Sequence, residues 1–309
     1  MYKIGNVGHN KNKIDKLASG EKEWILSSGW AGNELLNTDD YRAYVGGTSG
    51  LIYGFINDGF YTVDDFEYFD SASRTWHLKK GVVDSSPLSG IPSPGSAKFK
   101  KLTPVDEDSS NPYLLTSDDR TVIGKTTPKF SGGFGLNATY KGFDLGLFFN
   151  FMYGFDVFNA NKINLTTFYR NNYNNFGMEV ASTKRWRNYD DMGNDLRYDP
   201  EALAHFNKNA TIWNPTCMGR PVSMSYAVED GSFLRLNTAT IGYTLPRVWT
   251  KKVGLNKVRF YVSGYNLFTI TGYSGYDPEV NIATGLTPNI DNDRYPRSRT
   301  YTFGAQLTF

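Results

Sequence analysis

Apolar and polar residues alternate regularly along the last ten residues of the chain, TYTFGAQLTF. One file of this segment is apolar: Tyr301, Phe303, Ala305, Leu307 and Phe309. The residues between them are polar or small: Thr300, Thr302, Gly304, Gln306 and Thr308. Successive side chains of a β-strand point to opposite faces, so this pattern predicts a strand over residues 300–309 with one apolar and one polar face.

Four other segments show strand patterns of similar length. Residues 130–140 and 143–152 alternate on either side of Lys141-Gly142, which predicts a hairpin with a two-residue turn. Two more strands are predicted, one within residues 232–246 and one over residues 257–268. Each segment has about the 9–11 residues with which a tilted strand crosses a bilayer.

The connections between these strands sort by length. Two residues separate Tyr140 from Phe143, and eleven separate Leu245 from Lys257. By contrast, roughly eighty residues follow Met152 before the next strand, and thirty separate Phe268 from Arg299. All short connections fall at one end of the strands and all long ones at the other, which is the pattern of bacterial outer-membrane barrels with short periplasmic turns and long outer loops.

The predicted fold is therefore all-β, an antiparallel transmembrane β-barrel segment with long extracellular loops. Residues 1–129 show weaker strand patterns, for example in DDYRAYVGGTSGLIYGF and DGFYTVDDFEYF. We expect residues 1–129 to hold upstream barrel strands and long extracellular loops. Residues 130–309 are expected to hold the C-terminal barrel strands, with a closing strand over 300–309.

Composition narrows the function classes. The formal net charge is +2 with scattered Lys and Arg, so no basic stripe for nucleic acid is present. The chain has 21 Tyr, 21 Phe and 31 Gly, and a mean hydropathy of −0.46, a combination expected of strands that face lipid on one side and water on the other. No apolar run reaches the roughly 18 residues of a helical span, and the start has no apolar segment of signal-peptide type.

Several segments together resemble one family. The segments DDRTVIGKTTPKFSGGFGLNATYKGFDLGLFFNFMYGFDVFN, EDGSFLRLNTATIGYTLP, VRFYVSGYNLFTITGYSGYDPEV and YPRSRTYTFGAQLTF are similar to the C-terminal barrel region of SusC/RagA-type TonB-dependent outer-membrane transporters. The final strand also resembles the signal that the barrel-assembly machinery reads. Its positions are filled here by Thr302, Gly304, Leu307 and Phe309.

This resemblance implies a barrel of about 22 strands around a plug, located in the cell outer membrane. It implies TonB-dependent active import of oligosaccharides or peptides, together with a SusD-like surface lipoprotein. No plug domain or TonB box is recognised in the chain, so we expect it to be the C-terminal portion of a transporter, with TonB acting through the remainder. Whether it is a truncated gene, part of a split gene or a piece of a longer protein is left open.

Catalytic and metal-binding patterns are weak. Asp106 and Asp108 are weak calcium candidates, because the segment lacks the glycine and distal glutamate of a tight calcium loop. The three histidines are widely separated, Cys217 is the only cysteine, and no nucleophile–base pair can be argued. We therefore expect no enzyme, no cofactor and no metal.

Aromatic residues of the predicted outer loops are the candidates for substrate contact, since aromatic faces stack on sugar rings. They are Tyr169, Tyr173, Trp186, Trp213, Tyr273 and Tyr276. The alternative for these residues is packing within the loops or against a lid protein. Two other functions remain open at this stage: a secreted, soluble β-sandwich that binds glycans, and a small self-contained passive pore.

Overall fold

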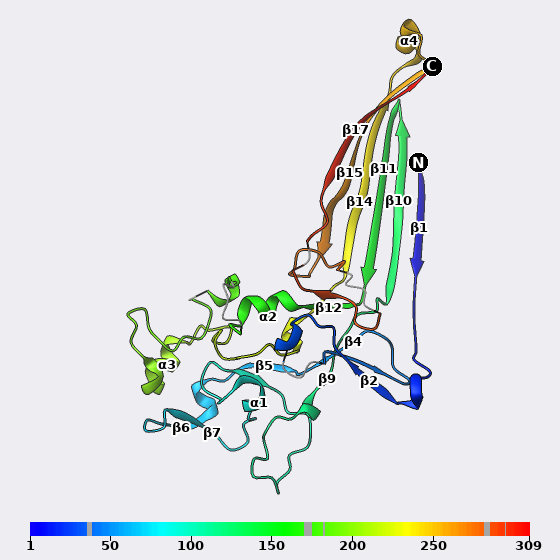
Figure 1. The fold of residues 1–309 in the computed structure, drawn as a ribbon. Helices are drawn as coiled ribbons and strands as arrows, with labels where there is room; N and C mark the ends of the chain where they lie inside the picture. Colours follow the sequence, from blue (N-terminus) through cyan, green and yellow to red (C-terminus); the bar gives the residue numbers. More distant parts are fainter. Residues whose placement is uncertain (36–38, 170–174, 182, 281–284, 294) are drawn as a thin grey trace.

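The structure, a computed structural model, describes residues 1–35, 39–169, 175–181, 183–280, 285–293 and 295–309. Two parts are evident in Figure 1: one long, narrow sheet and a lobe of short strands and helical turns at one end of it. None of the described helices is long and apolar enough to cross a membrane.

The long sheet is built from six antiparallel strands in the order β1-β10-β11-β14-β15-β17. Their bounds are β1 (Tyr2–Gly8), β10 (Phe130–Tyr140), β11 (Phe143–Tyr153), β14 (Phe233–Thr244), β15 (Lys257–Thr271) and β17 (Thr300–Thr308). The five strands predicted from alternation are all confirmed, and β15 extends three residues beyond its prediction. Among the six described strands of this sheet, β1 is the one whose position the sequence analysis did not predict.

The sorting of connections by length is also confirmed. Lys141 and Gly142 both have positive φ, 48° and 89°, as the tight turns of two-residue hairpins require. The other short connection, residues 245–256, lies at the same end of the sheet near the C-terminus (Figure 1). The long connections, residues 9–129, 154–232 and 272–299, lie at the opposite end and form the lobe.

Register places the apolar files of neighbouring strands on one face of the sheet. Leu145 lies opposite Ile241, which lies opposite Val262, which lies opposite Phe303. This face is not packed against protein in the described chain: Ile241 is 54% exposed and Phe303 78% exposed. An exposed apolar face of this extent fits a sheet whose second solvent is lipid.

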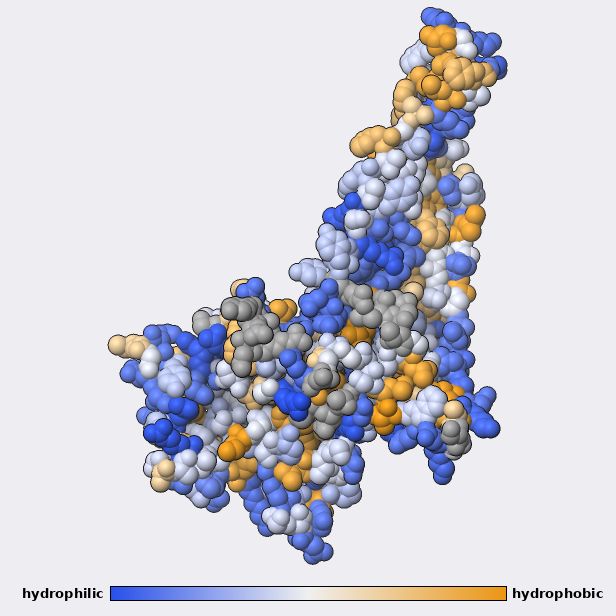
Figure 2. All heavy atoms as spheres, viewed as in Figure 1, coloured by the Kyte–Doolittle hydropathy of each residue, from blue (hydrophilic) through white to orange (hydrophobic). Residues whose placement is uncertain are grey.

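The opposite face of the sheet is polar. Asp144 and Arg259 form an ion pair across strands with an Nη2–Oδ2 distance of 2.5 Å, and the hydroxyls of Thr240 and Ser263 lie 2.8 Å apart. In Figure 2 the face turned toward the lobe side is largely hydrophilic, whereas hydrophobic residues follow the other edge of the sheet. The apolar face therefore suits contact with lipid and the polar face suits contact with water, as the sequence predicted.

Strand β1 does not follow this division. Lys3 pairs with Leu136 and therefore lies on the apolar face, while Ile4 pairs with Gly135 and lies on the polar face. Within residues 1–129, β1 is the one described strand that joins the long sheet. We predicted upstream barrel strands in this region, and one described strand, β1, lies in the long sheet. The other described strands of residues 1–129 belong to the lobe.

The lobe consists of small sheets and short helical turns. A four-stranded sheet contains β2 (Glu23–Leu26), β3 (Tyr41–Tyr44), β4 (Leu51–Gly54) and β9 (Thr121–Lys125). Two strand pairs are β5 (Asn57–Phe60) with β8 (Ala97–Phe99), and β6 (Phe66–Asp70) with β7 (Thr75–Leu78). A three-stranded sheet contains β12 (Asp156–Asn159), β13 (Val228–Asp230) and β16 (Ile290–Asp291).

Three of the four α-helices among the described residues also belong to the lobe. They are α1 (Ser86–Ser89), α2 (Ala160–Thr166) and α3 (Pro200–Phe206), while α4 (Arg247–Thr250) lies at the far end of the sheet. Short 3-10 turns cover Ala18–Gly20, Gly32–Glu34, Val63–Asp65, Ser117–Asp119, Met178–Val180, Leu196–Tyr198, Ser225–Ala227 and Lys251–Val253. The segment PEALAHF forms α3, which Asp199 caps by accepting a hydrogen bond from the Ala202 amide at 3.0 Å.

One hydrophobic core unites the three long connections. It buries Phe55 and Phe99 from the first connection, Phe158 and Trp213 from the second, and Ile290 from the third. Because each connection contributes large side chains to the same cluster, the lobe is a packed body with its own core. It can therefore hold surface residues in fixed positions.

A pair of substitutions in β14 tests the two-faced sheet. We expect Ile241→Arg to destabilise the transporter that contains this chain by about 1–2 kcal/mol, between the interface and midplane values for a charge on the lipid face, because Ile241 lies close to one end of β14. Thr238→Arg, on the polar face of the same strand, is the matched control and should cost much less. The measurement is the temperature at which heat-modifiable electrophoretic migration is lost; equal losses for both variants would contradict the assignment of the faces.

Candidate functional site

A hollow of the lobe lies between α2 and the connection 272–299, and we call it the rim cavity. Its volume is about 660 Å³, within the range of ligand pockets. The residues that line it are Asn159, Asn161, Lys162, Asn164, Leu165, Glu179, Ser274, Gly275, Tyr276, Asp293, Tyr295 and Pro296. Its wall thus combines amide, phenol and charged groups with the apolar surface of rings and aliphatic carbons.

The helix α2 is tied to the facing connection by amide side chains. Asn161 donates from Nδ2 to Asp291 Oδ1 at 3.1 Å and accepts at Oδ1 from the Asp293 amide at 2.9 Å. One turn later, Asn164 Nδ2 donates to Asn292 Oδ1 at 3.2 Å. These bonds hold the two walls of the rim cavity at a fixed separation.

Glu229 connects three segments at the base of the cavity. Its carboxylate accepts hydrogen bonds from the Ser274 amide at 2.9 Å, the Ser274 hydroxyl at 2.7 Å and Asn159 Nδ2 at 3.1 Å. Lys162 Nζ lies 3.4 Å from the same carboxylate. Burial alone would raise the pKa of Glu229, but the Ser274 hydrogen bonds and the charge of Lys162 together hold this pKa below its ordinary value.

The predicted substrate-contact aromatics divide into two groups. Tyr276 lines the rim cavity and is 83% exposed. Trp186, Trp213 and Tyr273 are buried instead: Trp213 donates from Nε1 to the Thr166 carbonyl at 3.1 Å, and Tyr273 donates to Asp291 Oδ2 at 2.6 Å. In the described chain these three side chains pack within the lobe, so of these four aromatics only Tyr276 has an exposed ring.

The remaining aromatics complete this picture. Tyr169 is half-buried against the main core and donates its hydroxyl to Asn164. Tyr173 lies outside the described residues. Tyr295, which the sequence analysis did not single out, lines the rim cavity at 92% exposure. It precedes Pro296, and a residue before proline favours extended backbone, which is the local signal that could have drawn attention to it.

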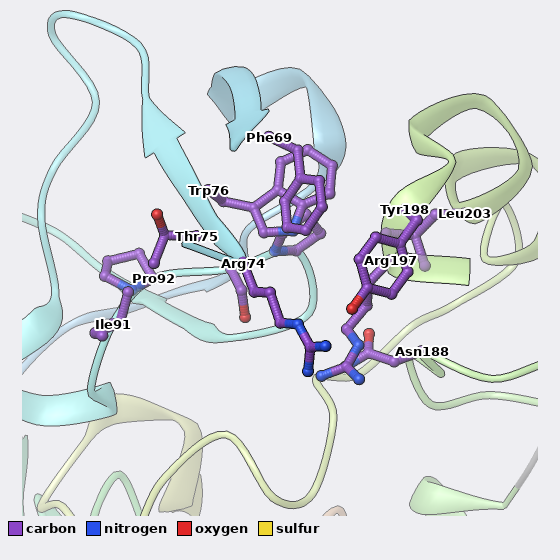
Figure 3. Close-up of a pocket in the computed structure, with 12 residues that line it drawn as sticks. Phe69, Arg74, Thr75, Trp76, Ile91, Pro92, Asn188, Arg197, Tyr198 and Leu203 are labelled. Atoms are coloured by element: carbon purple, nitrogen blue, oxygen red, sulfur yellow. The ribbon is translucent and has the colours of Figure 1, made fainter. Parts of the chain in front are cut away.

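A second, smaller hollow lies at the tip of the lobe. Its volume is about 240 Å³, and its walls include Phe69, Trp76 and Tyr198, with the guanidinium groups of Arg74 and Arg197 directed into it (Figure 3). Arg197 is paired with Asp195 at 2.6 Å, so part of this charge is neutralised. The volume is below the roughly 300 Å³ at which ligand pockets usually begin, so the rim cavity is the stronger candidate.

The residues of the expected assembly signal lie on β17 and just beyond it. Tyr261 lies opposite Gly304 in the register, and a Cβ added to Gly304 would come 2.3 Å from the Tyr261 ring. Gly304 therefore makes room for that ring on the polar face, beside Thr302 two residues earlier. Leu307 and Phe309 belong to the apolar file, and Phe309 is 84% exposed.

The weak calcium candidates lie in an exposed turn. The Asp108 amide donates to Asp106 Oδ1 at 3.2 Å. Among the described residues, no group of three or more His, Cys, Asp or Glu side chains is arranged to hold a metal ion. The calcium expectation therefore gains no support here.

Comparison with known proteins places the whole chain in one group. The TonB-dependent receptor P3 of Formosa agariphila is 30% identical over 98% of this chain and 26% of the receptor. The TonB-dependent receptor SusC of Bacteroides thetaiotaomicron is 32% identical over 44% of this chain and 14% of its own length. No family model matches the chain. The chain spans about a quarter of the length of P3.

The fold has solved counterparts. The structure of the RagAB peptide transporter covers 100% of this chain with a TM-score of 0.65 at 22% identity, and this chain covers 27% of that one. The same transporter in its open-open state matches with a TM-score of 0.60. At this identity the match shows the fold. The relatives are receptors and transporters rather than enzymes.

Glu229 gives a pH-dependent prediction. Because its pKa is lowered in the folded chain, its contribution to stability is complete above the ordinary glutamate value of 4.5 and is lost as the pH falls through the folded value. We expect Glu229→Gln to cost about 2 kcal/mol near neutral pH and progressively less as the pH is lowered below the ordinary glutamate value. The measurement is the melting temperature of the purified transporter at neutral and at low pH.

The control for this prediction is Glu67→Gln, since Glu67 is an exposed glutamate on β6 for which no such cluster of donors exists among the described contacts. It should leave the melting temperature unchanged at both pH values. A Glu229→Gln loss of the same size at low and neutral pH would contradict the role given to the charged carboxylate.

Proposed function

Because the chain belongs to the SusC/RagA-type TonB-dependent transporters of the outer membrane, we propose that it forms part of the wall and the extracellular lobe of an importer. The proposed cargo is an oligosaccharide or a peptide, taken up in a TonB-dependent process. The chain itself is proposed to bind and guide the cargo without bond chemistry. Residues 1–129 then supply upstream wall and loops, and residues 130–309 supply the later strands, closed by 300–309.

The observation that carries this proposal is the sheet with one apolar and one polar face, whose long connections all lie at one end. A soluble β-sandwich buries the apolar face of each sheet against the other, whereas Ile241 and Phe303 are exposed here. The two edge strands, β1 and β17, each pair on one side only among the described strands. In lipid an open edge leaves backbone groups without partners, which favours a larger barrel over a small self-contained pore.

The rim cavity is the proposed contact point for cargo within this chain. Tyr276 and Tyr295 offer exposed rings that can stack on sugar rings or on peptide side chains. Asn161 and Asn164 offer amide groups beside them. Rings combined with amide groups, and with the charged Lys162, Glu179 and Asp293 in the same wall, suit a polar ligand surface such as a glycan or a peptide backbone.

Two partners follow from the same proposal. The relative SusC and the RagAB transporter support a SusD-like surface lipoprotein above the lobe and energy supplied by the TonB complex. TonB would act through a part of the transporter outside this chain. The barrel-assembly machinery would read the last strand during insertion.

Uptake measurements test the proposal directly. Cells that carry the transporter are supplied with fluorescent maltooligosaccharides or fluorescent casein-derived peptides, with and without a proton-motive-force uncoupler. We expect accumulation of one cargo class, and loss of that accumulation with the uncoupler or on deletion of TonB. Uptake that persists without TonB would favour the passive pore instead.

The cavity aromatics can be tested separately from transport. We expect Tyr276→Ala/Tyr295→Ala to weaken binding of the transported cargo roughly tenfold, since each stacked ring is worth about 0.5–1.5 kcal/mol. Tyr68→Ala removes another exposed phenol, on β6 and outside the lining of the rim cavity, and should leave affinity unchanged. The measurement is isothermal titration calorimetry on the purified transporter. Unaltered affinity in the double variant would remove the rim cavity from the binding site.

The last strand gives an assembly prediction. Deletion of Phe309 should leave the barrel unassembled and protease-sensitive, because the exposed terminal aromatic is part of the proposed signal. Phe309→Trp keeps an aromatic ring at the membrane interface and should assemble normally. Heat-modifiable migration of outer-membrane extracts reports the result, and normal migration of the deletion variant would refute the assigned role.

A further inference from the structure

The connection 245–256 forms a structured projection at the short-connection end of the sheet. It contains α4 followed directly by the 3-10 turn Lys251–Val253, and Gly254 ends the helical run with a positive φ of 74°. Both ends are bonded to the sheet: the Leu245 amide donates to the Val258 carbonyl at 2.9 Å, and the Asn256 amide donates to the Thr308 carbonyl at 2.8 Å. The projection is therefore held in place beside the C-terminus (Figure 1).

Large apolar side chains of this projection point away from the protein. Val248 is 72% exposed, Trp249 59% and Val253 70%. Trp249 and Val253 are four residues apart along the helical run and so share a face. Thr250, by contrast, is buried. Figure 2 shows this end as a group of hydrophobic residues next to hydrophilic ones.

The same projection is strongly basic. Residues 245–257 contain Arg247, Lys251, Lys252 and Lys257, and no Asp or Glu. The neighbouring hairpin turn adds Lys141, again without an acidic residue between Tyr140 and Phe143. An exposed tryptophan beside a cluster of cations is the combination with which interfacial segments bind bilayers that carry negative headgroups.

The position of the projection fixes which surface it meets. Tyr243 and the 52% exposed Phe260, which belong to the apolar face, lead into and out of the connection. The apolar surface of α4 is thus continuous with the face that contacts lipid. Short connections of outer-membrane barrels face the periplasm, so the relevant surface is the periplasmic leaflet.

We propose that residues 245–257 form an interfacial anchor that binds anionic phospholipid headgroups of the periplasmic leaflet. Val248, Trp249 and Val253 enter the headgroup region, and Arg247, Lys251 and Lys252 pair with phosphates. Juxtamembrane cations gain binding energy from a negative leaflet, and this gain is screened by salt. The inference depends on the outer-membrane location and not on the cargo.

Quenching of Trp249 fluorescence tests the anchor. The complete transporter is placed in nanodiscs that contain an equal fraction of brominated phosphatidylglycerol or brominated phosphatidylcholine. The contribution of Trp249 is the difference between the wild type and Trp249→Phe, which removes the other tryptophans from the comparison. We expect quenching by the anionic lipid to be about threefold greater, and the excess to disappear at high salt.

Matched charge variants complete the test. Arg247→Gln/Lys251→Gln/Lys252→Gln should abolish the preference for the anionic lipid. Lys79→Gln/Lys80→Gln/Lys208→Gln removes three exposed cations from the lobe instead and should retain it. Equal quenching by both lipids would overturn the charge selection, and absence of quenching by either would overturn the membrane contact, leaving a periplasmic protein partner for this surface.

Discussion

Pairing of backbone polar groups in hydrocarbon is the constraint on which the rest of this structure depends. An unpaired amide or carbonyl costs several kcal/mol in lipid, so a strand there must be bonded on both sides. The ladder from β1 to β17 is antiparallel throughout, and it continues past the register shifts at Phe148/Phe149 and between Leu236 and Thr238. Once the strands must be paired and must span the bilayer, alternation, strand length and tight turns at one end follow.

Backbone groups of the long connections can bond to water, so these connections need no continuous ladder of strands. They fold instead into a second body, the lobe. That body needs its own hydrophobic core and polar anchors. Asp119 is one such anchor: it accepts hydrogen bonds from the Leu102, Thr103 and Thr116 amides at 2.8, 2.7 and 2.7 Å. Burial would raise the pKa of Asp119, but these hydrogen bonds outweigh it and lower the pKa to about 2. A charged carboxylate thus closes a loop that has little regular structure.

How much the sequence predicts differs between the two bodies for a physical reason. In the sheet, the period of two is imposed locally by lipid and water, so the ends of β10, β11 and β14 are predicted to within one or two residues. Strand β1 lacks that signal, because it carries Lys3 on the apolar face and Ile4 on the polar face. Its place is set by pairing with β10 rather than by its own pattern.

In the lobe, burial depends on neighbours that are distant in sequence. Trp186 is a clear example: it packs onto Gly95, where an added Cβ would lie 2.2 Å from the indole ring, and it contacts Phe60 edge-on. The residues that neighbour Trp186 in the sequence do not indicate either contact. Aromatic residues of a loop therefore have the same appearance in sequence whether they form a core or face a ligand, and only the packing separates Trp186 from Tyr276.

One continuous stretch of chain leads from the rim cavity to the projection at the other end of the sheet. Glu229, at the base of the rim cavity, lies in β13, which leads through Gly231 and Ser232 into β14, and β14 leads into α4. With 12 residues, β14 spans about 40 Å. A paired strand resists extension, so the sheet holds the rim cavity and α4 at a fixed separation.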